Sequence, residues 1–207
     1  KLGDMPPSGG DYQFYKNLKV EPLLAKQVTT YFAEILKTNG RIEQFIDSDY
    51  TYMNQTLAKW IYKREGIRGE RLRKVKLNDP RRGGIFTQPG LMTATANGVD
   101  TSPVIRGVWV LENILGTPPS PPPPDVEPLP TDTREATTIR EQLALHRKNE
   151  ACYSCHVKID PMGFAFENFD VVGRWRDRYK RAKGSIDTSA TMANGEEIAD
   201  IVAFKQM

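Results

Sequence analysis

The chain has 207 residues, of which 39% are hydrophobic and 27% are charged. This balance excludes a membrane protein, which needs long apolar stretches, and a disordered chain, which lacks the apolar residues to build a core. The net charge of +3, from 29 basic and 26 acidic residues, gives no indication of a nucleic-acid-binding protein. We therefore expect a soluble globular protein with one large domain or two small ones.

The N-terminal residues carry no sign of an export signal or a membrane anchor. The chain begins at Lys1 with a polar segment rich in proline and glycine, and no stretch reaches the ~18 consecutive apolar residues of a transmembrane helix. We expect a processed or excised piece of a longer protein, whose export signal is not in this chain. Two cysteines are too few for a disulfide-stapled fold, so their position decides what they do.

Two helices are predicted in the first third of the chain. Apolar residues recur at helical spacing over 22–36, and Asn39-Gly40 is a typical stop signal. The cap residues Asp47-Ser48-Asp49 then predict a second helix, which continues through Tyr62 and ends at Gly66.

The middle of the chain combines a basic segment with a further helix. The segment Lys63–Arg82 holds nine lysines and arginines and several glycines, which indicates a solvated loop or a surface for an acidic partner. Ser102-Pro103 is typical of a helix start and predicts a helix that ends at Gly116. Small strand pairs are expected around Lys74–Leu77 and Ser185–Met192.

A proline-rich stretch forms the clearest internal boundary. Eight of the 15 prolines lie in residues 117–130, which predicts an extended polyproline strap. The strap is expected to pack on its own protein or to make contacts between subunits. After it, the capping box Thr138-Ile139-Arg140-Glu141 predicts a helix that leads directly to the cysteines.

Both cysteines fall in the segment Cys152-Tyr-Ser-Cys155-His156, which is the C-x-x-C-H pattern of c-type haem attachment. Two thiols three positions apart lie on one side of a helical turn, where each can form a thioether with a vinyl group of the porphyrin. The adjacent His156 is then placed to ligate the iron as the proximal ligand. Because the chain has no second motif of this kind, we expect one haem c per chain.

Two other readings of the cysteine pair remain open. A zinc site would need Cys152, Cys155, His146 and one further ligand, because His156 is badly placed to complete the same tetrahedron. A dithiol redox centre normally lies in a βαβ context, and nothing in this chain alternates strands with helices.

Several segments resemble a known family. Arg82-Gly-Gly-Ile85, the helix Thr101–Gly116, the proline-rich strap and the segment Cys152–Asp170 are together similar to the third planctomycete cytochrome c domain family. The stretch before them, with Ile46–Asn54 and Leu57-Ala-Lys-Trp60, resembles the domain of unknown function that precedes it in those proteins. The tail after Ile186, with Asn194-Gly195-Glu196, resembles the small domain that follows.

The resemblance implies an exported, multi-domain c-type cytochrome of which these residues form a C-terminal portion. It implies a periplasmic or cell-surface location, and partners that are other redox domains or electron-transfer proteins. No nucleic acid and no transmembrane segment of this chain is expected to take part. The predicted domains are a helical domain over 1–80, the haem domain with its strap over 81–180, and the start of a small domain over 181–207.

The second axial ligand of the iron decides between an electron carrier and a haem enzyme. Met192 is the leading candidate, because the 36 residues after His156 allow the chain to pass to the distal side of the ring. Met92 and His146 are the weaker candidates. Met162 lies only six residues beyond His156, so we expect it to pack against the haem or the core.

The residues after the motif suggest how the haem would be surrounded. Asp160-Pro161 is expected to end the helix that carries the cysteines, and a backbone carbonyl released by the proline could accept the outer N–H of the proximal imidazole. Nearby aromatic residues would form an apolar wall or an ordinary core: Phe164, Phe166, Phe169 and Trp175. Arginines are candidate partners of the haem propionates, in the basic segment or at Arg174, Arg176 and Arg178.

The expected fold is mostly α, a cytochrome c-like helical haem domain preceded by a helical domain and a polyproline strap. The expected function is electron transfer within a larger redox protein. The alternatives are a haem enzyme of peroxidase or dehydrogenase type with an open distal site, and a structural or assembly module stabilised by haem. Whether the chain is itself an enzyme is left open. Because the haem would contribute a large apolar core element, we expect the haem-free chain to be poorly ordered.

Overall fold

The computed structural model describes residues 5–121, 138–147, 150–179 and 185–207. Helices clearly outweigh strands in it, which confirms the prediction of a mostly helical protein. In the described part of the chain, no helix is long and apolar enough to cross a membrane. The chain divides into two compact units, each assembled from separate segments. Unit 1 contains 1–102, 169–175 and 201–207, and unit 2 contains 103–168 and 176–200.

The longest helix of unit 1 is α2, Val20–Lys37, which confirms the first predicted helix. Its buried face carries Leu24, Tyr31 and Ile35, which recur at helical spacing. The chain leaves the helix where the sequence predicts it: Asn39 adopts a φ of 50°, and the N–H of Gly40 donates to the carbonyl of Ile35. The helix is preceded by η1 (Gly10–Tyr12) and α1 (Gln13–Asn17), and it is followed by α3 (Glu43–Ile46).

The second predicted helix is wrong in its first half. Residues Tyr50–Met53 form strand β1, which pairs antiparallel with β2, Arg73–Lys76. The helix starts only after Asn54, whose side chain accepts a hydrogen bond from the N–H of Leu57 and so caps it. Alternating Tyr and Thr favour a strand once a partner is available, and that partner lies 20 residues further along the chain. Cap residues 47–49 alone could not show this.

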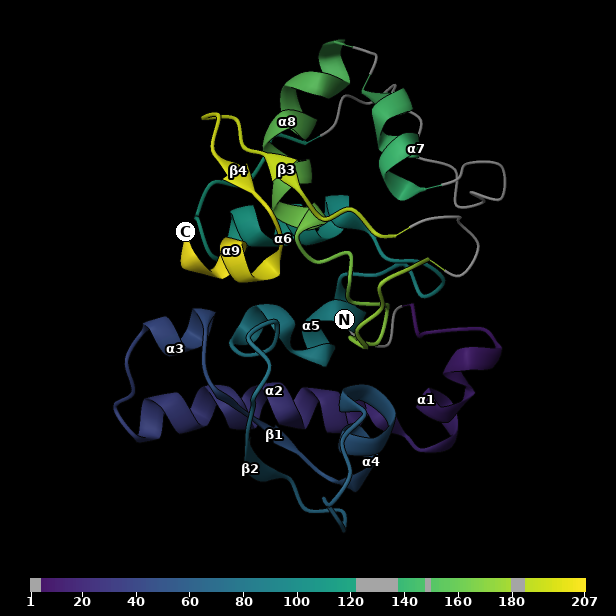
Figure 1. Cartoon of the computed structure of the whole chain (residues 1–207), viewed down its shortest axis with the longest axis vertical. Coiled ribbons are helices and arrows are strands. Elements are labelled where there is room, and N and C mark those ends of the chain that lie inside the picture. Colours follow the sequence, from purple (N-terminus) through teal and green to yellow (C-terminus); the bar gives the residue numbers. More distant parts are fainter. Residues whose placement is uncertain (1–4, 122–137, 148–149, 180–184) are drawn as a thin grey trace. The chain divides into compact units, whose positions relative to one another are not determined.

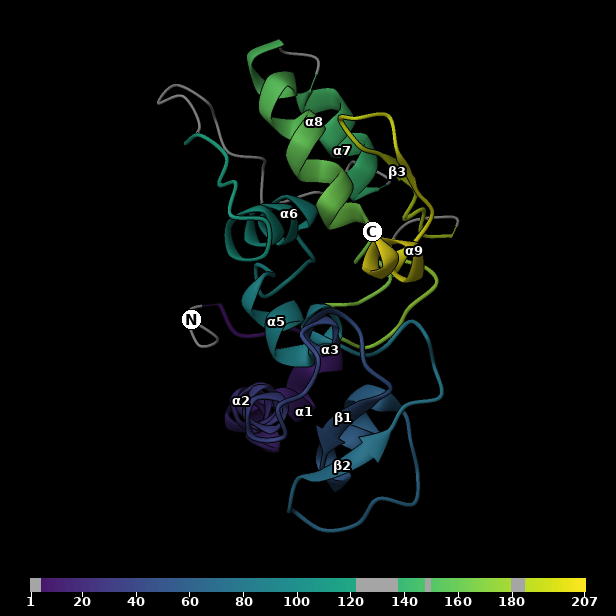
Figure 2. The same cartoon turned by 90° about the vertical axis from the view of Figure 1, so that its left-hand side faces the viewer.

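The short helix α4, Gln55–Leu57, continues into a turn of π-helix, η2, Ala58–Tyr62. The expected strand around Lys74–Leu77 is confirmed as β2, and its residues are mostly exposed, as predicted for the basic segment. Figures 1 and 2 show the β1–β2 ribbon beside α2, which it contacts. Arg82 is the exception in the basic segment, because it is buried with its Nη1 donating to the carbonyl of Gly173.

The rest of unit 1 consists of η3 (Ile85–Thr87), α5 (Pro89–Ala94) and the C-terminal helix α9 (Ile201–Gln206). Phe204 of α9 packs edge-on against Phe86. The buried Lys205 binds the carboxylate of Asp47 and the backbone carbonyls of Pro80 and Arg82. One apolar cluster of unit 1 joins distant segments: Phe14, Tyr15, Val20, Leu24, Met53, Leu57, Ala58, Ile61, Leu77, Ala96, Val171 and Val172.

Unit 2 is built on two helices in close contact, α6 (Pro103–Asn113) and α8 (Glu150–Phe164). Figure 1 shows the two helices together. A Cβ at Gly107 would collide with the backbone carbonyl of Ile159, and a Cβ at Gly163 would collide with that of Pro103. The two glycines therefore allow the helix backbones to touch. The predicted helix after Ser102 is confirmed, and Gly116 follows it with a φ of 63°.

Helix α7, Ile139–His146, begins with the predicted capping box. The N–H of Glu141 donates to the hydroxyl of Thr138, and the N–H of Thr138 donates to the carboxylate of Glu141. A second strand pair, β3 (Ala190–Thr191) with β4 (Glu197–Ile198), confirms the strands expected near Ser185–Met192. Residues 117–121 have no regular secondary structure, and the rest of the predicted strap lies outside the described residues.

The predicted end of the cysteine-bearing helix at Asp160-Pro161 is wrong. Helix α8 continues through Pro161 to Phe164. A proline inside a helix removes one backbone hydrogen bond and usually bends or ends it. Here α6 contacts α8 on both sides of the proline, at Ile159 and at Gly163, and this packing holds the last turn helical.

Candidate functional site

The residues of the C-x-x-C-H motif lie on one face of α8. At 3.6 residues per turn, Cys152, Cys155 and His156 fall within a single stripe along the helix. Ile159 and Gly163 continue the same stripe, and these two residues contact α6. The face is thus divided along its length: its C-terminal half packs on α6, and its N-terminal half carries the two thiols and the imidazole.

The thiols are not joined to each other. Cys152 is buried, Cys155 is half-buried, and both are free cysteines. Two reduced thiols, three residues apart in an intact helical turn, are the form that thioether attachment requires. The side chain of His156 is 13% exposed, so the imidazole next to them is largely shielded from solvent.

The imidazole of His156 is oriented by Asp160, one helical turn further on. Its Nδ1 lies 2.8 Å from the carboxylate Oδ1 of Asp160. An ionised carboxylate can only accept hydrogen bonds, so Nδ1 must be the protonated nitrogen of this pair. In the neutral imidazole the lone pair is then on Nε2, the nitrogen that would ligate iron.

Asp160 is fully buried, with an exposed side-chain fraction of 0%. Its second carboxylate oxygen, Oδ2, lies 3.6 Å from Nε of Arg147 and accepts no hydrogen bond within the described part of the chain. Burying a carboxylate is costly unless it is paired. The guanidinium of Arg147 offsets part of that cost. The carboxylate of Asp160 therefore interacts with His156 through one oxygen and with Arg147 through the other.

The structure places the candidate sixth ligands in different surroundings. Met192 is half-buried in the turn that joins β3 to β4, in the same unit as His156. Met92 is buried in α5, in the core of unit 1. The side chain of His146 lies outside the described residues. Met162 is buried near the C-terminus of α8, as expected of a packing residue.

The aromatic residues after the motif divide between the two units. Phe164 packs with Leu143 and Ala190 in unit 2. Phe169 and Trp175 belong to unit 1, where they meet edge-on with ring centroids 5.3 Å apart. Phe169 is fully buried and Trp175 is partly buried, and the choice between a haem wall and an ordinary core stays a prediction.

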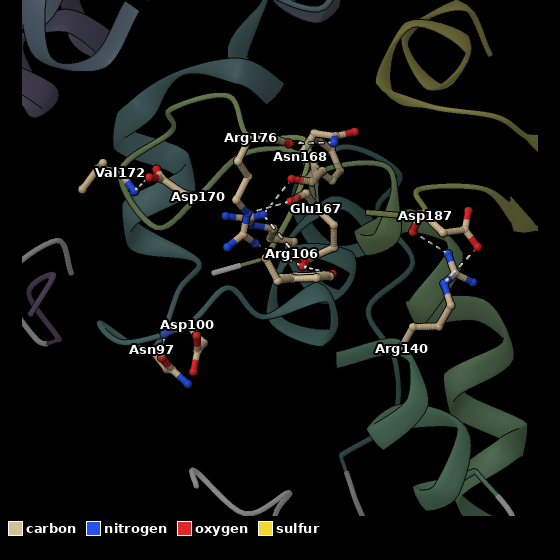
Figure 3. Close-up of polar contacts among 12 residues, drawn as sticks. Asn97, Asp100, Arg106, Arg140, Glu167, Asn168, Asp170, Val172, Arg176 and Asp187 are labelled. Atoms are coloured by element: carbon tan, nitrogen blue, oxygen red, sulfur yellow. Dashed lines mark hydrogen bonds and ion pairs between the residues drawn. The ribbon is translucent and has the colours of Figure 1, made fainter. Parts of the chain in front are cut away.

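Two of the candidate propionate partners, Arg174 and Arg176, pair with carboxylates of the chain itself. Arg174 binds Asp170 at 2.7 Å in unit 1. In unit 2, Arg176 and Arg106 approach the buried carboxylate of Glu167 from two sides, at 3.4 and 3.5 Å (Figure 3). Arg178 is exposed.

Glu167 lies at the centre of a polar cluster in unit 2. Arg106 also donates to the carbonyl of Phe166 at 2.9 Å, and the hydroxyl of Tyr179 donates to Glu167 at 2.9 Å. Burial and the adjacent Glu167 carboxylate raise the pKa of Tyr179 well above its usual value. Elsewhere in the unit, Arg140 of α7 pairs with Asp187 (Figure 3) and covers the ring of Phe164.

The surroundings of the cysteine pair bear on the zinc and dithiol readings, and both stay open. In the described ranges, no three His, Cys, Asp or Glu side chains converge to hold a metal ion. The predicted zinc set also includes His146, whose side chain is outside those ranges. The thiols of Cys152 and Cys155 lie on a helix that packs against another helix, and the βαβ context of a dithiol centre is not seen around them.

Comparison with known families covers most of the chain. Residues 82–179 match the model of PSCyt3, a protein of unknown function (DUF1588). Residues 1–62 match the model of PSD4, a protein of unknown function (DUF1592). The matches support the planctomycete-type domain family and identify no specific member. No curated protein and no solved structure matches the chain.

The cysteine motif lies inside the PSCyt3 segment, and the name of that family indicates a cytochrome c-like domain. The matched segment 82–179 contains residues of both compact units, so its ends do not coincide with the boundaries between the units. The predicted domain boundaries at 80 and 180 therefore stay predictions.

Two features of the site were missed at the level of sequence. The carboxylate of Asp160, rather than a backbone carbonyl near Pro161, receives the imidazole Nδ1–H. The i, i+4 spacing of His156 and Asp160 could have shown this if the helix had been predicted to continue. The Arg106–Glu167 pair joins residues 61 positions apart, and no local pattern indicates it.

Proposed function

We propose that this chain carries one covalently attached haem c and transfers electrons within a larger exported redox protein. The observation that supports it is the arrangement on α8, where two free thiols and an oriented imidazole share one helix face. The match of the surrounding segment to the PSCyt3 model supports the same reading. Cys152 and Cys155 would hold the porphyrin, and His156 would ligate the iron through Nε2.

The chain's own residues fit such a group in three respects. The two cysteines are not joined by a disulfide, the imidazole is shielded and contacts Asp160, and the helix packs against α6 beyond the motif. When bound, a haem supplies one-electron chemistry between ferric and ferrous iron. We propose Met192 as the sixth ligand, and other redox domains or electron-transfer proteins as partners.

The proposed location is the periplasm or cell surface, where c-type haem is attached. Covalent attachment keeps the group in place in a compartment from which a loosely held one would be lost. The strap over 117–130 is proposed to pack on the protein or to contact a neighbouring subunit.

The test is expression of the whole chain in a periplasm that contains haem-attachment machinery, followed by visible spectra of the oxidised and reduced protein. We expect absorbance that stays with the protein after denaturation and organic extraction, and a sharp α band on reduction. Cys152→Ala with Cys155→Ala should abolish the attached absorbance, whereas the exposed control Glu112→Gln should retain it. A colourless wild-type protein would overturn the proposal and direct attention to zinc analysis and thiol titration.

The axial ligands are tested in the same samples. Met192→Ala should convert the reduced spectrum from six-coordinate low-spin to high-spin, whereas Met92→Leu should leave it unchanged. If cyanide or azide binds the wild-type protein readily, the distal face is open and the haem-enzyme alternative replaces the electron carrier.

A further inference from the structure

The pair of His156 and Asp160 goes beyond what the motif requires. Attachment needs two thiols and an imidazole, and the C-x-x-C-H pattern already supplies these. The structure adds a buried carboxylate 2.8 Å from the outer nitrogen of that imidazole. Neither the motif nor the family matches assigns it a role.

The burial of Asp160 has a cost that its ion pair with Arg147 offsets only in part. One oxygen faces His156, and the other accepts no hydrogen bond from any described residue. A carboxylate that only stabilised the fold would be expected to have both oxygens satisfied. Its position is explained by the imidazole that it faces.

The carboxylate changes the ligand that it contacts. A carboxylate that accepts the outer N–H fixes the tautomer and ring orientation of a metal-binding histidine, and it makes the coordinating nitrogen more basic. A more electron-donating nitrogen stabilises the higher oxidation state of the metal. Arg147, 3.6 Å from the other oxygen, withdraws part of that negative charge.

We propose that Asp160 is a positioning residue for His156, which places the lone pair on Nε2 and lowers the reduction potential of the attached haem. Arg147 withdraws negative charge from the same carboxylate and so limits how far Asp160 lowers the reduction potential. This inference rests on the proposed function, because it requires that the haem be attached. Three side chains would then set the reduction potential of the haem: His156 and Asp160 of α8, and Arg147, which directly follows α7.

The test compares variants of the holoprotein by redox titration with small-molecule mediators. Asp160→Asn keeps the shape and a hydrogen-bond acceptor but removes the charge, and we expect the ferrous-to-ferric ratio at a fixed solution potential to rise about tenfold, or about 59 mV for a one-electron couple. Arg147→Gln should shift the ratio in the opposite direction. Glu112→Gln, an exposed carboxylate on α6, should leave it unchanged.

A second measurement needs no variant. In the ferrous wild-type protein, the Nδ1–H proton of His156 should give a separate resonance that exchanges slowly with water, because it is held by a buried carboxylate. Fast exchange of this proton would overturn the inference even if Asp160→Asn fails to mature. An unchanged potential in a haem-loaded Asp160→Asn protein would also overturn it. Wild-type protein without attached haem would instead refute the proposed function.

Discussion

Glu167 binds two arginines at a position from which water is excluded. Its side chain and that of Arg106 are 0% and 1% exposed, and the two lie 3.5 Å apart. Removing one partner of a buried ion pair leaves the other charge desolvated, which costs more than the pair itself contributes. A change of one charge in this cluster should therefore have a large effect on stability.

We expect Glu167→Gln to lower the free energy of unfolding by about 3–5 kcal/mol. The amide can still accept the hydroxyl of Tyr179, so the loss reports the missing charge beside Arg106 and Arg176. Urea unfolding of the holoprotein measures it, with the exposed Glu112→Gln as the control. A change below about 1 kcal/mol would show that the arginines are satisfied by other groups.

Tyr15 presents the opposite case, a buried hydroxyl that adds no stability. Its oxygen has no hydrogen-bond partner among the described residues, and burial, assisted by the charge of Glu21, raises its pKa to about 12 from 10.0. The folded state then holds the proton more tightly than the unfolded state. Below pH 10 the titration of Tyr15 therefore leaves the stability of the fold unchanged. As the pH rises from 10 towards 12, the unfolded state loses this proton first, and the stability of the fold falls.

Tyr15→Phe should therefore leave stability at pH 7 unchanged or raise it by about 1 kcal/mol, because a desolvated hydroxyl is removed. Between pH 10 and pH 12 the variant should lose less stability than the wild-type protein. Denaturant unfolding at pH 7 and pH 11 checks both parts. A loss of stability at pH 7 would mean that the hydroxyl has a partner in solution.

The contact of α6 with α8 depends on the absence of two side chains. A methyl group at Gly163 would meet the carbonyl of Pro103, and backbone atoms cannot move aside as a flexible side chain can. We expect Gly163→Ala to destabilise the chain by about 1–3 kcal/mol, and to reduce haem attachment because α8 is displaced. Thermal unfolding and the absorbance per chain measure the two effects.

The matched control is Gly10→Ala, at a glycine with nothing within 4 Å of the added Cβ and an ordinary backbone conformation. It should change neither stability nor absorbance. Equal behaviour of the two variants would show that the helices separate without cost.

The elements that could be predicted from the sequence are those whose signals are local. The spacing in α2, the stop at Asn39-Gly40 and the capping box at Thr138 all act within a few residues, and all are confirmed. The strand β1 was missed because its partner β2 is distant in the sequence. The end of α8 was misplaced because packing against α6 overrides the local effect of Pro161.

In the candidate site, too, the local features could be predicted from the sequence and the contacts set by tertiary structure could not. The thiols and His156 are read directly from a five-residue motif, whereas the carboxylate that orients the imidazole depends on a helix that continues past a proline. The basic segment shows the same limit: most of it is exposed as predicted, yet Arg82 is buried and binds the carbonyl of Gly173, 91 positions away. Long-range partners of polar side chains are set by the tertiary structure.

At the scale of the whole molecule, the chain forms two compact units, and apolar side chains are buried in each of them. Unit 1 has two clusters, one around Leu24 and Met53 and one around Tyr31 and Tyr50. In unit 2 one cluster surrounds Leu143 and Phe164, and apolar residues of α6 and α8 are also buried, among them Val110, Leu111 and Ile159. The candidate haem site lies in α8 and therefore in unit 2.

This location predicts which part of the chain depends on haem. A thioether-attached haem stays on the chain after unfolding, so it would stabilise the fold through the apolar contacts that it makes only in the folded state, in the unit that carries it. In the variant that combines Cys152→Ala with Cys155→Ala, amide hydrogen exchange in α6 and α8 should accelerate by about tenfold or more, equivalent to about 1.4 kcal/mol. Exchange in α2 and β1 should stay within about twofold of the wild-type rate, because their core contains no residue of the motif. Equal acceleration in both units would show that the chain folds as one cooperative whole, and no acceleration would show that haem adds nothing to its stability.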